Sequence, residues 1–179
     1  MAQLFWHLTP VERAAAFIYF QPRSEMARMV YQMKYGNSPD VGEDLGRLMA
    51  SDMQMAHYFD DIDLLLPVPL TPKRQRQRGY NQSEMLALGI SSITHLPVAA
   101  QALKRTVFRE SQTHLTRHER QENVDGMFVV NDADQLKGRH VLLIDDVCTT
   151  GATLIACSQA LASVEGIRIS VLTLGFTKA

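Results

Sequence analysis

The chain has 179 residues, 46% of them hydrophobic and 21% charged, a balance that is typical of a folded globular domain. Its formal net charge of −1 excludes a strongly basic polyanion-binding protein. Two cysteines without a C-x-x-C spacing exclude a disulfide scaffold and give no zinc motif. The first ten residues lack the features of a secretory signal and no stretch approaches the roughly 18 apolar residues needed to span a bilayer, so we expect a cytoplasmic protein without a membrane segment.

The N-terminal segment carries a helix-start signal followed by an ambiguous apolar run. The sequence TPVE at residues 9–12 has the pattern of a capping box with proline at the first helical position. The run AAAFIYF at residues 14–20 is too short to distinguish a helix from a strand by periodicity. We therefore predict that a helix begins near residue 10, and we leave the following run open.

Two further helices are predicted in the N-terminal third of the chain. Ser24 can cap a helix that ends near Gly36, and another helix begins at the Ser38–Pro39 pair. Apolar residues recur at helical spacing in both segments. We expect residues 1–60 to form a helical N-terminal part that packs on the core of one domain, residues 1–179.

A buried strand, a helix and an ambiguous polar region follow. Residues 62–66 form a short apolar run that indicates a buried strand, and Pro67 and Pro69 end it. A helix is expected at about residues 81–93. Residues 97–130 contain two apolar stretches around a long polar, basic middle, which favours a hairpin or an excursion loop.

The last third of the chain alternates clearly between strands and helices. Residues 140–144 are the strongest strand prediction in the chain. Leu154, Cys157 and Leu161 recur at helical spacing and mark the inner face of a helix, and residues 167–174 close as a strand. This alternation predicts an α/β fold, with a mostly parallel, twisted sheet that is covered by helices on both faces.

The segment VLLIDDVCTTGAT, residues 141–153, places a turn rich in threonine and glycine between a strand and a helix. The first N–H groups of a helix have no partner within the helix, and the helix dipole favours negative charge there. Gly151 permits close backbone approach, and Thr149, Thr150 and Thr153 add hydroxyl donors. No G-K-[ST] follows a spaced glycine, so the turn is not a Walker loop, but its chemistry suits a phosphate.

Asp145 and Asp146, the acidic pair, stand between this strand and the turn. Carboxylates beside a phosphate site repel the ligand unless they bind something else, and ribose hydroxyls and Mg²⁺ both suit carboxylate oxygens. The alternative is that the two aspartates cap the helix or solvate the end of the strand. Their place directly before the threonine-rich turn favours the functional interpretation.

The same segment resembles the signature of the type I phosphoribosyltransferases, proteins that bind 5-phosphoribosyl-1-pyrophosphate (PRPP). The resemblance implies their fold, with a mostly parallel sheet, helices on both faces and a flexible hood loop. It implies that Asp145 and Asp146 hold the ribose hydroxyls and hold Mg²⁺ directly or indirectly. It also implies that the 5-phosphate is bound by the turn residues Thr149, Thr150, Gly151, Ala152 and Thr153.

A basic stretch follows the first predicted buried strand. Its four cations occupy six positions, at Lys73, Arg74, Arg76 and Arg78. Arginine and lysine are suited to clamp a pyrophosphate, and they also stabilise charge that develops on a departing pyrophosphate. A short basic run is, however, also common on a solvated face.

The sequence PVPLTPKRQRQRGYNQ, residues 67–82, resembles the competence protein F (ComF) and GntX-like branch of phosphoribosyltransferase-like proteins. Many members of that branch begin with a four-cysteine zinc module, which this sequence does not contain, so no metal or contact of that module is expected. The resemblance implies that pyrophosphate is bound by Leu70, Thr71, Lys73 and Arg78.

A third stretch matches the same branch. The matching residues recur at the branch's intervals, at Arg105, Gln112, Leu115, Arg120, Asn123, Gly126 and Phe128. In the type I fold this region is a hood that closes over PRPP and excludes water. The alternative is an ordinary polar hairpin. The resemblance implies a catalytic role for Arg105 and hood contacts from Gln112, Arg117 and Arg120.

The implied function is transfer of the 5-phosphoribosyl group to an unidentified nitrogen acceptor, with release of pyrophosphate, Mg²⁺ as cofactor, and Asp145, Asp146 and Arg105 as catalytic residues. Competence proteins offer a second interpretation, a non-catalytic accessory of DNA uptake or a PRPP-sensing module. In that case the basic stretches at residues 73–78 and 104–120 follow single-stranded DNA. Proteins of the type I fold are often dimers, which leaves a homodimer open.

Overall fold

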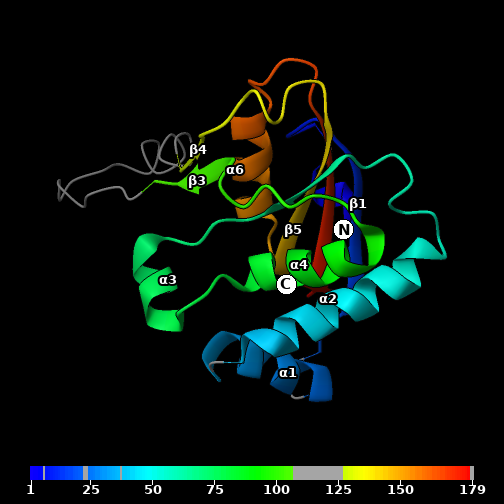
Figure 1. Ribbon diagram of the computed structural model, residues 1–179, viewed down its shortest axis with the longest axis vertical. Helices are drawn as coiled ribbons and strands as arrows, with labels where there is room; N and C mark the ends of the chain where they lie inside the picture. Colours follow the sequence, from blue (N-terminus) through cyan, green and yellow to red (C-terminus); the bar gives the residue numbers. More distant parts are fainter. Residues whose placement is uncertain (6, 22–23, 37, 107–126, 178–179) are drawn as a thin grey trace.

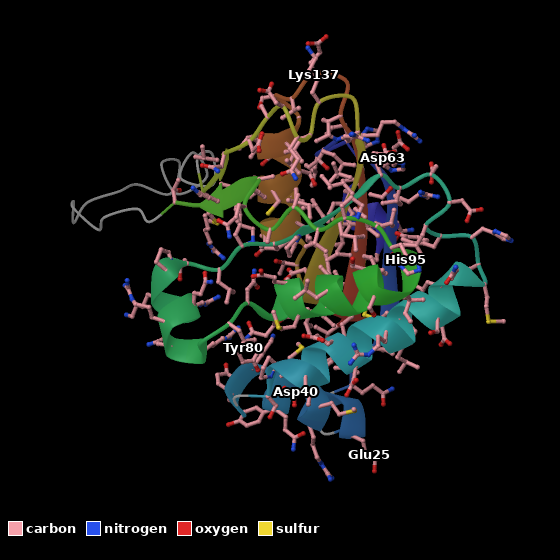
Figure 2. All side chains as sticks on the ribbon, viewed as in Figure 1. Glu25, Asp40, Asp63, Tyr80, His95 and Lys137 are labelled. Atoms are coloured by element: carbon pink, nitrogen blue, oxygen red, sulfur yellow. The ribbon has the colours of Figure 1, made fainter. Side chains whose placement is uncertain are left out.

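The centre of the molecule is a parallel sheet of four strands in the order β1-β6-β5-β2 (Figure 1). The strands are β1, Val11–Tyr19; β2, Leu64–Pro67; β5, His140–Cys148; and β6, Arg168–Phe176. Asp63, just before β2, lies at the amino edge of the sheet, and Tyr80 lies beyond the opposite, carboxyl edge (Figure 2). The computed structural model describes residues 1–5, 7–21, 24–36, 38–106 and 127–177.

The central strands are apolar along most of their length because both of their faces are covered. Successive side chains of a strand point to opposite faces, so Leu143 belongs to the core on one side of the sheet and Leu142 to the core on the other. The pairing of β2 with β5 joins Leu65 to Leu142 and Leu66 to Leu143. Each core is therefore continuous from strand to strand.

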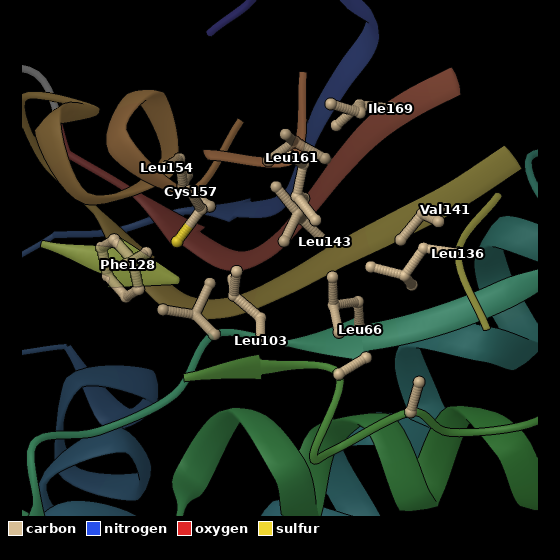
Figure 3. Close-up of a cluster of buried hydrophobic side chains, with 14 of the residues drawn as sticks. Leu66, Leu103, Phe128, Leu136, Val141, Leu143, Leu154, Cys157, Leu161 and Ile169 are labelled. Carbon is tan, nitrogen blue, oxygen red and sulfur yellow. The ribbon is translucent and has the colours of Figure 1, made fainter. Parts of the chain in front are cut away.

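Helices cover both faces of the sheet, and the predicted α/β fold is confirmed (Figure 1). On one face lie α4, Gln82–Thr94, and α2, Pro39–Gln54, with α1, Glu25–Tyr35, packed on α2. On the other lie α6, Ala152–Leu161, and an antiparallel pair, β3, Leu103–Arg105, and β4, Phe128–Val130. Figure 3 shows side chains of α6, β4 and β5 gathered in the core on this face, which contains Leu143. No described helix is both long and apolar enough to cross a membrane.

The N-terminal segment differs from its prediction. After a short 3₁₀ helix, η1, Ala2–Leu4, residues Val11–Tyr19 form the edge strand β1 and not a helix. The branched and aromatic residues at positions 17–19 pack well on a sheet once β6 is available as a partner, and Pro10 stands just before the strand, where its missing N–H is not needed. The capping-box prediction is therefore wrong, and residues 1–60 are only partly helical.

Two other boundaries differ near the carboxyl edge. β5 continues past residue 144 to Cys148, because its pairing with β6 continues to Cys148↔Phe176. The acidic pair thus lies on the strand itself. The basic stretch forms helix α3, Pro72–Arg78, which begins after the N-cap Thr71 and ends at Gly79, where φ is +79°.

Helices α2 and α4 approach each other closely through glycine. A Cβ on Gly89 would lie 2.1 Å from the backbone oxygen of Glu43, and a Cβ on Gly46 would lie 2.2 Å from that of Leu86. A backbone oxygen cannot move aside as a flexible side chain can, so both positions require glycine. The close contact fixes α4, whose first turn reaches the carboxyl edge of the sheet.

Gly89→Ala should therefore destabilise the fold, although alanine is the better helix former. The gain in helix propensity is about 1 kcal/mol, whereas overpacking typically costs about 1–3 kcal/mol and costs more when backbones must separate. We expect a net loss in the free energy of unfolding, measured by urea denaturation. The exposed α2 variant Asp52→Ala should stay within about 0.5 kcal/mol of the parent. A Gly89→Ala protein as stable as the parent would show that the helices are not in such close contact.

Candidate functional site

The carboxyl edge of the sheet brings together segments from distant parts of the chain. β2 leads there into α3, β5 leads into α6, and the end of α1 and the start of α4 lie alongside. A cleft of about 190 Å³, the site cleft, opens between these segments. Its lining includes Arg74, Arg78, Arg105, Asp145, Asp146 and Thr153.

The carboxylate of Asp145 is held from two sides. Its Oδ1 accepts a hydrogen bond from the hydroxyl of Ser83 at 3.0 Å and another from the backbone N–H of Asp146 at 2.9 Å. Burial, and next the neighbouring Asp146 carboxylate, raises the pKa of Asp145 from 3.8 to about 7. A carboxyl group so perturbed in the wall of a cleft is typical of a functional site.

Asp146 is paired with a lysine from a distant helix. The Nζ of Lys34, in the last turn of α1, lies 2.8 Å from Asp146 Oδ2, and the two side chains are 23% and 14% exposed. The other oxygen, Oδ1, accepts the backbone N–H of Val147 at 2.5 Å. An ammonium group thus stands at a carboxylate oxygen that a sugar hydroxyl or a metal ion could use.

The acidic pair has the chemistry that Mg²⁺ prefers. Both residues line the site cleft with carboxylate oxygens, the ligands of hard divalent cations. The ammonium of Lys34 already stands beside the pair as a cation supplied by the chain itself. The pair therefore fits a divalent cation.

A second cluster of potential ligands lies at the amino edge of the sheet. Ligand atoms of Glu12, Asp61 and His140 lie within 4.8 Å of one another. Arg168, however, donates to both oxygens of Glu12 at 2.8 Å and to Asp61 at 3.1 Å. Arg13 also pairs with Asp61. Because two guanidinium groups neutralise the two carboxylates, we interpret this cluster as a structural ion-pair network.

The turn between β5 and α6 presents the start of a helix. Gly151 has a φ of +79°, a conformation that residues with a side chain rarely adopt, so the turn favours glycine. Thr149 and Thr150 are exposed, and the hydroxyl of Thr150 accepts the first N–H of α6 at a long 3.4 Å. The turn lines a pocket of about 40 Å³ that shares Asp145 with the site cleft. The turn and the acidic pair are therefore neighbours.

The basic stretch at residues 73–78 contributes Arg74 and Arg78 to the site cleft. Leu70, in the chain that leads from β2 to this stretch, also lines it. The hydroxyl of Thr71 instead caps α3, where it accepts the N–H of Arg74 at 3.3 Å. Lys73 is exposed and is not among the residues that line the cleft. Of the four predicted pyrophosphate ligands, Leu70 and Arg78 thus lie at the cleft, and Arg74 joins them.

Arg105 enters the site cleft from β3. Its guanidinium carbon lies 5.3 Å from the ring centroid of Phe128, and its Nη2 lies 3.3 Å from the sulfur of Met127. Burial, and next the charge of Arg74, lowers the pKa of Arg105, while the charge of Asp145 raises it. The predicted hood residues Gln112, Arg117 and Arg120 lie outside the described residues.

Ser83 and Lys34, whose side chains contact the acidic pair, were not predicted from the sequence as site residues. The N-cap Asn81 donates to the carbonyl of Val68 at 3.0 Å and accepts the N–H of Ser83 at 3.2 Å, which ties the start of α4 to the chain leaving β2. The N-cap pattern is visible in the sequence, but the contact of Ser83 with Asp145 is not. Lys34 gives no local signal at all, because its partner is brought to it only by the packing of α1.

Comparisons with known proteins agree with this geometry. A family model described as the phosphoribosyl transferase domain matches residues 75–176. The chain is 29% identical over 139 residues to the DNA utilization protein YhgH of Escherichia coli O157:H7, with 76% of this chain and 60% of that protein covered. It is 29% identical over 157 residues to competence protein F of Haemophilus influenzae, with 84% and 67% covered. The chain therefore spans about 60% of the length of the YhgH relatives.

Solved structures show the same fold. The allosteric regulatory enzyme of purine biosynthesis superposes with a TM-score of 0.53 at 16% identity, over 79% of this chain and 30% of that one. The glutamine PRPP amidotransferase from B. subtilis, complexed with ADP and GMP, gives the same values. At this identity the likeness concerns the fold alone, and the predicted type I phosphoribosyltransferase-like fold is confirmed.

The raised pKa of Asp145 predicts a pH-dependent cost in stability. The folded chain binds this proton more tightly than the unfolded chain, so the contribution of Asp145 to stability is complete below pH 3.8 and is lost as the pH rises through about 7. Asparagine cannot ionise, but its Oδ1 can accept the same hydrogen bonds from Ser83 and Asp146. We expect Asp145→Asn to melt at a higher temperature than the parent at pH 8, with the difference shrinking toward pH 4.

Thermal melts at several pH values, in buffer without divalent cations, measure this difference. A pKa unit corresponds to about 1.4 kcal/mol, and 1 kcal/mol shifts the Tm of a chain of this size by about 2–4 °C. We expect a gap of several degrees at pH 8. A gap that does not change with pH would contradict the raised pKa.

Proposed function

We propose, because the chain belongs to the phosphoribosyl transferase domain family, that it binds PRPP and transfers the 5-phosphoribosyl group to a nitrogen acceptor with release of pyrophosphate. The observation that carries the proposal is that the acidic pair and the arginines of α3 line the site cleft, while the turn before α6 lines an adjoining pocket that shares Asp145 with it. PRPP presents a phosphate, two adjacent ribose hydroxyls and a pyrophosphate. The cleft offers suitable chemistry for each of these groups.

Each part of PRPP has partners in the chain. The turn at residues 149–153 offers N–H groups at a helix start and threonine hydroxyls for the 5-phosphate. The acidic pair accepts hydrogen bonds from the ribose hydroxyls. Arg74 and Arg78 line the cleft where they can bind the pyrophosphate, and Arg105 adds a third positive charge from β3.

The reaction exchanges one bond at the anomeric carbon of the ribose. The bond from this carbon to the pyrophosphate oxygen breaks, and its electron pair leaves with the pyrophosphate. The lone pair of the acceptor nitrogen forms the new C–N bond, and the nitrogen loses a proton to water. The arginines stabilise the charge on the leaving group, and the carboxylates stabilise the positive charge on the ribose ring. Mg²⁺ bound at the acidic pair supplies further shielding of the pyrophosphate charge.

The buried cysteines are consistent with a reducing compartment. Cys148 and Cys157 are both free thiols. Free thiols persist in the cytoplasm, where disulfides are rare. We therefore place the proposed function in the cytoplasm.

Removal of both carboxylate charges should weaken PRPP binding. A hydrogen bond to a charged group contributes about 1.5–3 kcal/mol, and 1.4 kcal/mol is a factor of about ten. We expect Asp145→Asn/Asp146→Asn to bind PRPP with Mg²⁺ at least tenfold more weakly than the parent in calorimetric titrations. The exposed pair Asp132→Asn/Asp134→Asn serves as the control and should bind as the parent does. Equal heats from the parent and the site variant would remove the binding proposal.

Turnover is tested by incubation with PRPP and a panel of nucleobases and ammonia, with pyrophosphate release as the readout. We expect release with one acceptor class from the parent and none from Asp145→Asn/Asp146→Asn. Binding of PRPP without release across the panel would favour the alternative, a PRPP-sensing module or a non-catalytic accessory of DNA uptake.

A second candidate function, binding of single-stranded nucleic acid, is favoured by a neighbouring cleft of about 850 Å³, the basic cleft. Tyr31 and Tyr35 of α1 are exposed, and their ring centroids lie 4.8 Å apart. A cationic groove with exposed aromatic rings is typical of proteins that bind single strands, and the names of the relatives agree with such a role. The basic cleft is lined by Lys34, Tyr35, Arg74, Arg76, Gln77, Arg78 and Gly79.

Tyr31→Ala/Arg76→Ala should weaken the binding of a single-stranded oligonucleotide. Stacking of one base contributes about 1–3 kcal/mol, so we expect a loss of about tenfold in gel shifts, together with a weaker dependence on salt. Lys137→Ala, at the amino edge of the sheet (Figure 2), removes an exposed cation and should have no effect. Unchanged binding in the double variant, or no binding by the parent, would exclude this cleft as a nucleic-acid site.

A further inference from the structure

The end of α1 is fastened to the site by three consecutive residues. The hydroxyl of Tyr80 donates to the carbonyl of Met33 at 2.5 Å, and Figure 2 shows Tyr80 beside α1. The guanidinium of Arg78 stacks over the ring of Tyr35, 5.5 Å from its centroid. Between them, Lys34 reaches Asp146. The same α3–α4 segment that supplies a cleft arginine thus also fixes the position of Lys34.

Lys34 belongs to both clefts. It lines the site cleft with the acidic pair, and it lines the basic cleft with Arg74 and Arg78. Its ammonium lies 2.8 Å from Asp146 Oδ2. The long, flexible stem of a lysine lets the ammonium exchange this carboxylate for another anion in the same cleft.

We propose that Lys34 makes Mg²⁺ binding at the acidic pair depend on PRPP, by occupying Asp146 until the pyrophosphate of PRPP gives its ammonium a new partner. The inference rests on the proposed PRPP site. It assigns Lys34 as a positioning residue, because it acts through the acidic pair and not on the anomeric carbon.

The charges of the cleft explain this dependence. Mg²⁺ that enters alone must displace the ammonium from a sheltered ion pair and leave it in a cleft that three further cations line, Arg74, Arg78 and Arg105. When PRPP is present, its pyrophosphate neutralises the arginines and accepts the ammonium as well. Lys34 therefore opposes Mg²⁺ alone and favours Mg²⁺ together with PRPP. Such a coupling is reciprocal, so Mg²⁺ and PRPP each raise the affinity for the other.

Removal of the ammonium should uncouple the two ligands. Without Lys34, Asp146 loses the ammonium that contacts its Oδ2, and Mg²⁺ no longer has to displace it. We expect Lys34→Met to bind Mg²⁺ alone at least fivefold more tightly than the parent, at the lower end of typical couplings of about 5–150-fold. The factor by which PRPP raises Mg²⁺ affinity should fall by a similar amount. PRPP itself chelates Mg²⁺, and the comparison between variants cancels this contribution.

The experiment is a set of calorimetric titrations of Mg²⁺, with and without PRPP, into the parent chain and its variants. Lys34→Arg keeps the charge and should retain the coupling, although its geometry differs. Arg28→Met removes an exposed cation from the same helix and should behave as the parent does. A role of Lys34 in merely fastening α1 would change stability but not the affinity for Mg²⁺ alone.

The unaltered protein gives a second measurement if Lys34→Met does not fold. The side-chain NMR signal of Lys34 should move when Mg²⁺ and PRPP are added together and should stay in place with Mg²⁺ alone. A shift with Mg²⁺ alone, or equal Mg²⁺ affinity and equal coupling in Lys34→Met and the parent, overturns the role of Lys34 and leaves PRPP binding intact. No PRPP binding by the parent removes the proposed function and this inference with it.

Discussion

The parallel pairing of β5 with β6 beyond the apolar core is the constraint on which the site depends. Pairing continues from Asp145↔Thr173 to Cys148↔Phe176, so the backbone of the acidic pair is fixed by a neighbouring strand. A loop at this position would leave two adjacent carboxylates free to turn toward water and away from each other. The strand keeps them at the rim of the core, directly before a turn whose glycine and helix start suit a phosphate. In open α/β sheets, ligands bind in the crevice outside the carboxyl ends of the strands, which is the edge where the acidic pair lies.

The fixed position of the acidic pair has an energetic cost that other groups offset. Burial and mutual repulsion oppose ionisation of Asp145, while the hydroxyl of Ser83 and the ammonium of Lys34 favour it. Both of these groups come from helices on one face of the sheet. These helices are held in place by the close contact of α2 with α4 and by the packing of α1 on α2. Both contacts therefore affect the ionisation of Asp145, although neither of them lies at the site. The buried carboxylate lowers the stability of the fold, and a cationic or hydroxyl-bearing ligand that binds to it can offset this loss.

The sequence predicts those elements of the fold and the site that depend on a local pattern of residues. The strand–turn–helix at residues 140–161, the helix at about residues 81–93 and the apolar strands follow from local patterns, and the resemblance at residues 141–153 predicts the family. The helix predicted to begin near residue 10 is wrong because a capping pattern is a weak preference, which β6 overrides by pairing with the segment. Lys34 and Ser83 escape detection because their role depends on partners far along the chain. The placement of Thr71 and Lys73 away from the cleft depends on the helical turn of α3, which the basic run did not reveal.

A crystal structure of the chain with Mg²⁺ and PRPP tests the central claim most directly. We expect the 5-phosphate to lie within hydrogen-bond distance of the backbone N–H groups of residues 150–153, with the ribose hydroxyls on Asp145 and Asp146 and the pyrophosphate between Arg74 and Arg78. A sugar phosphate bound elsewhere, without contact to either carboxylate, would contradict the account.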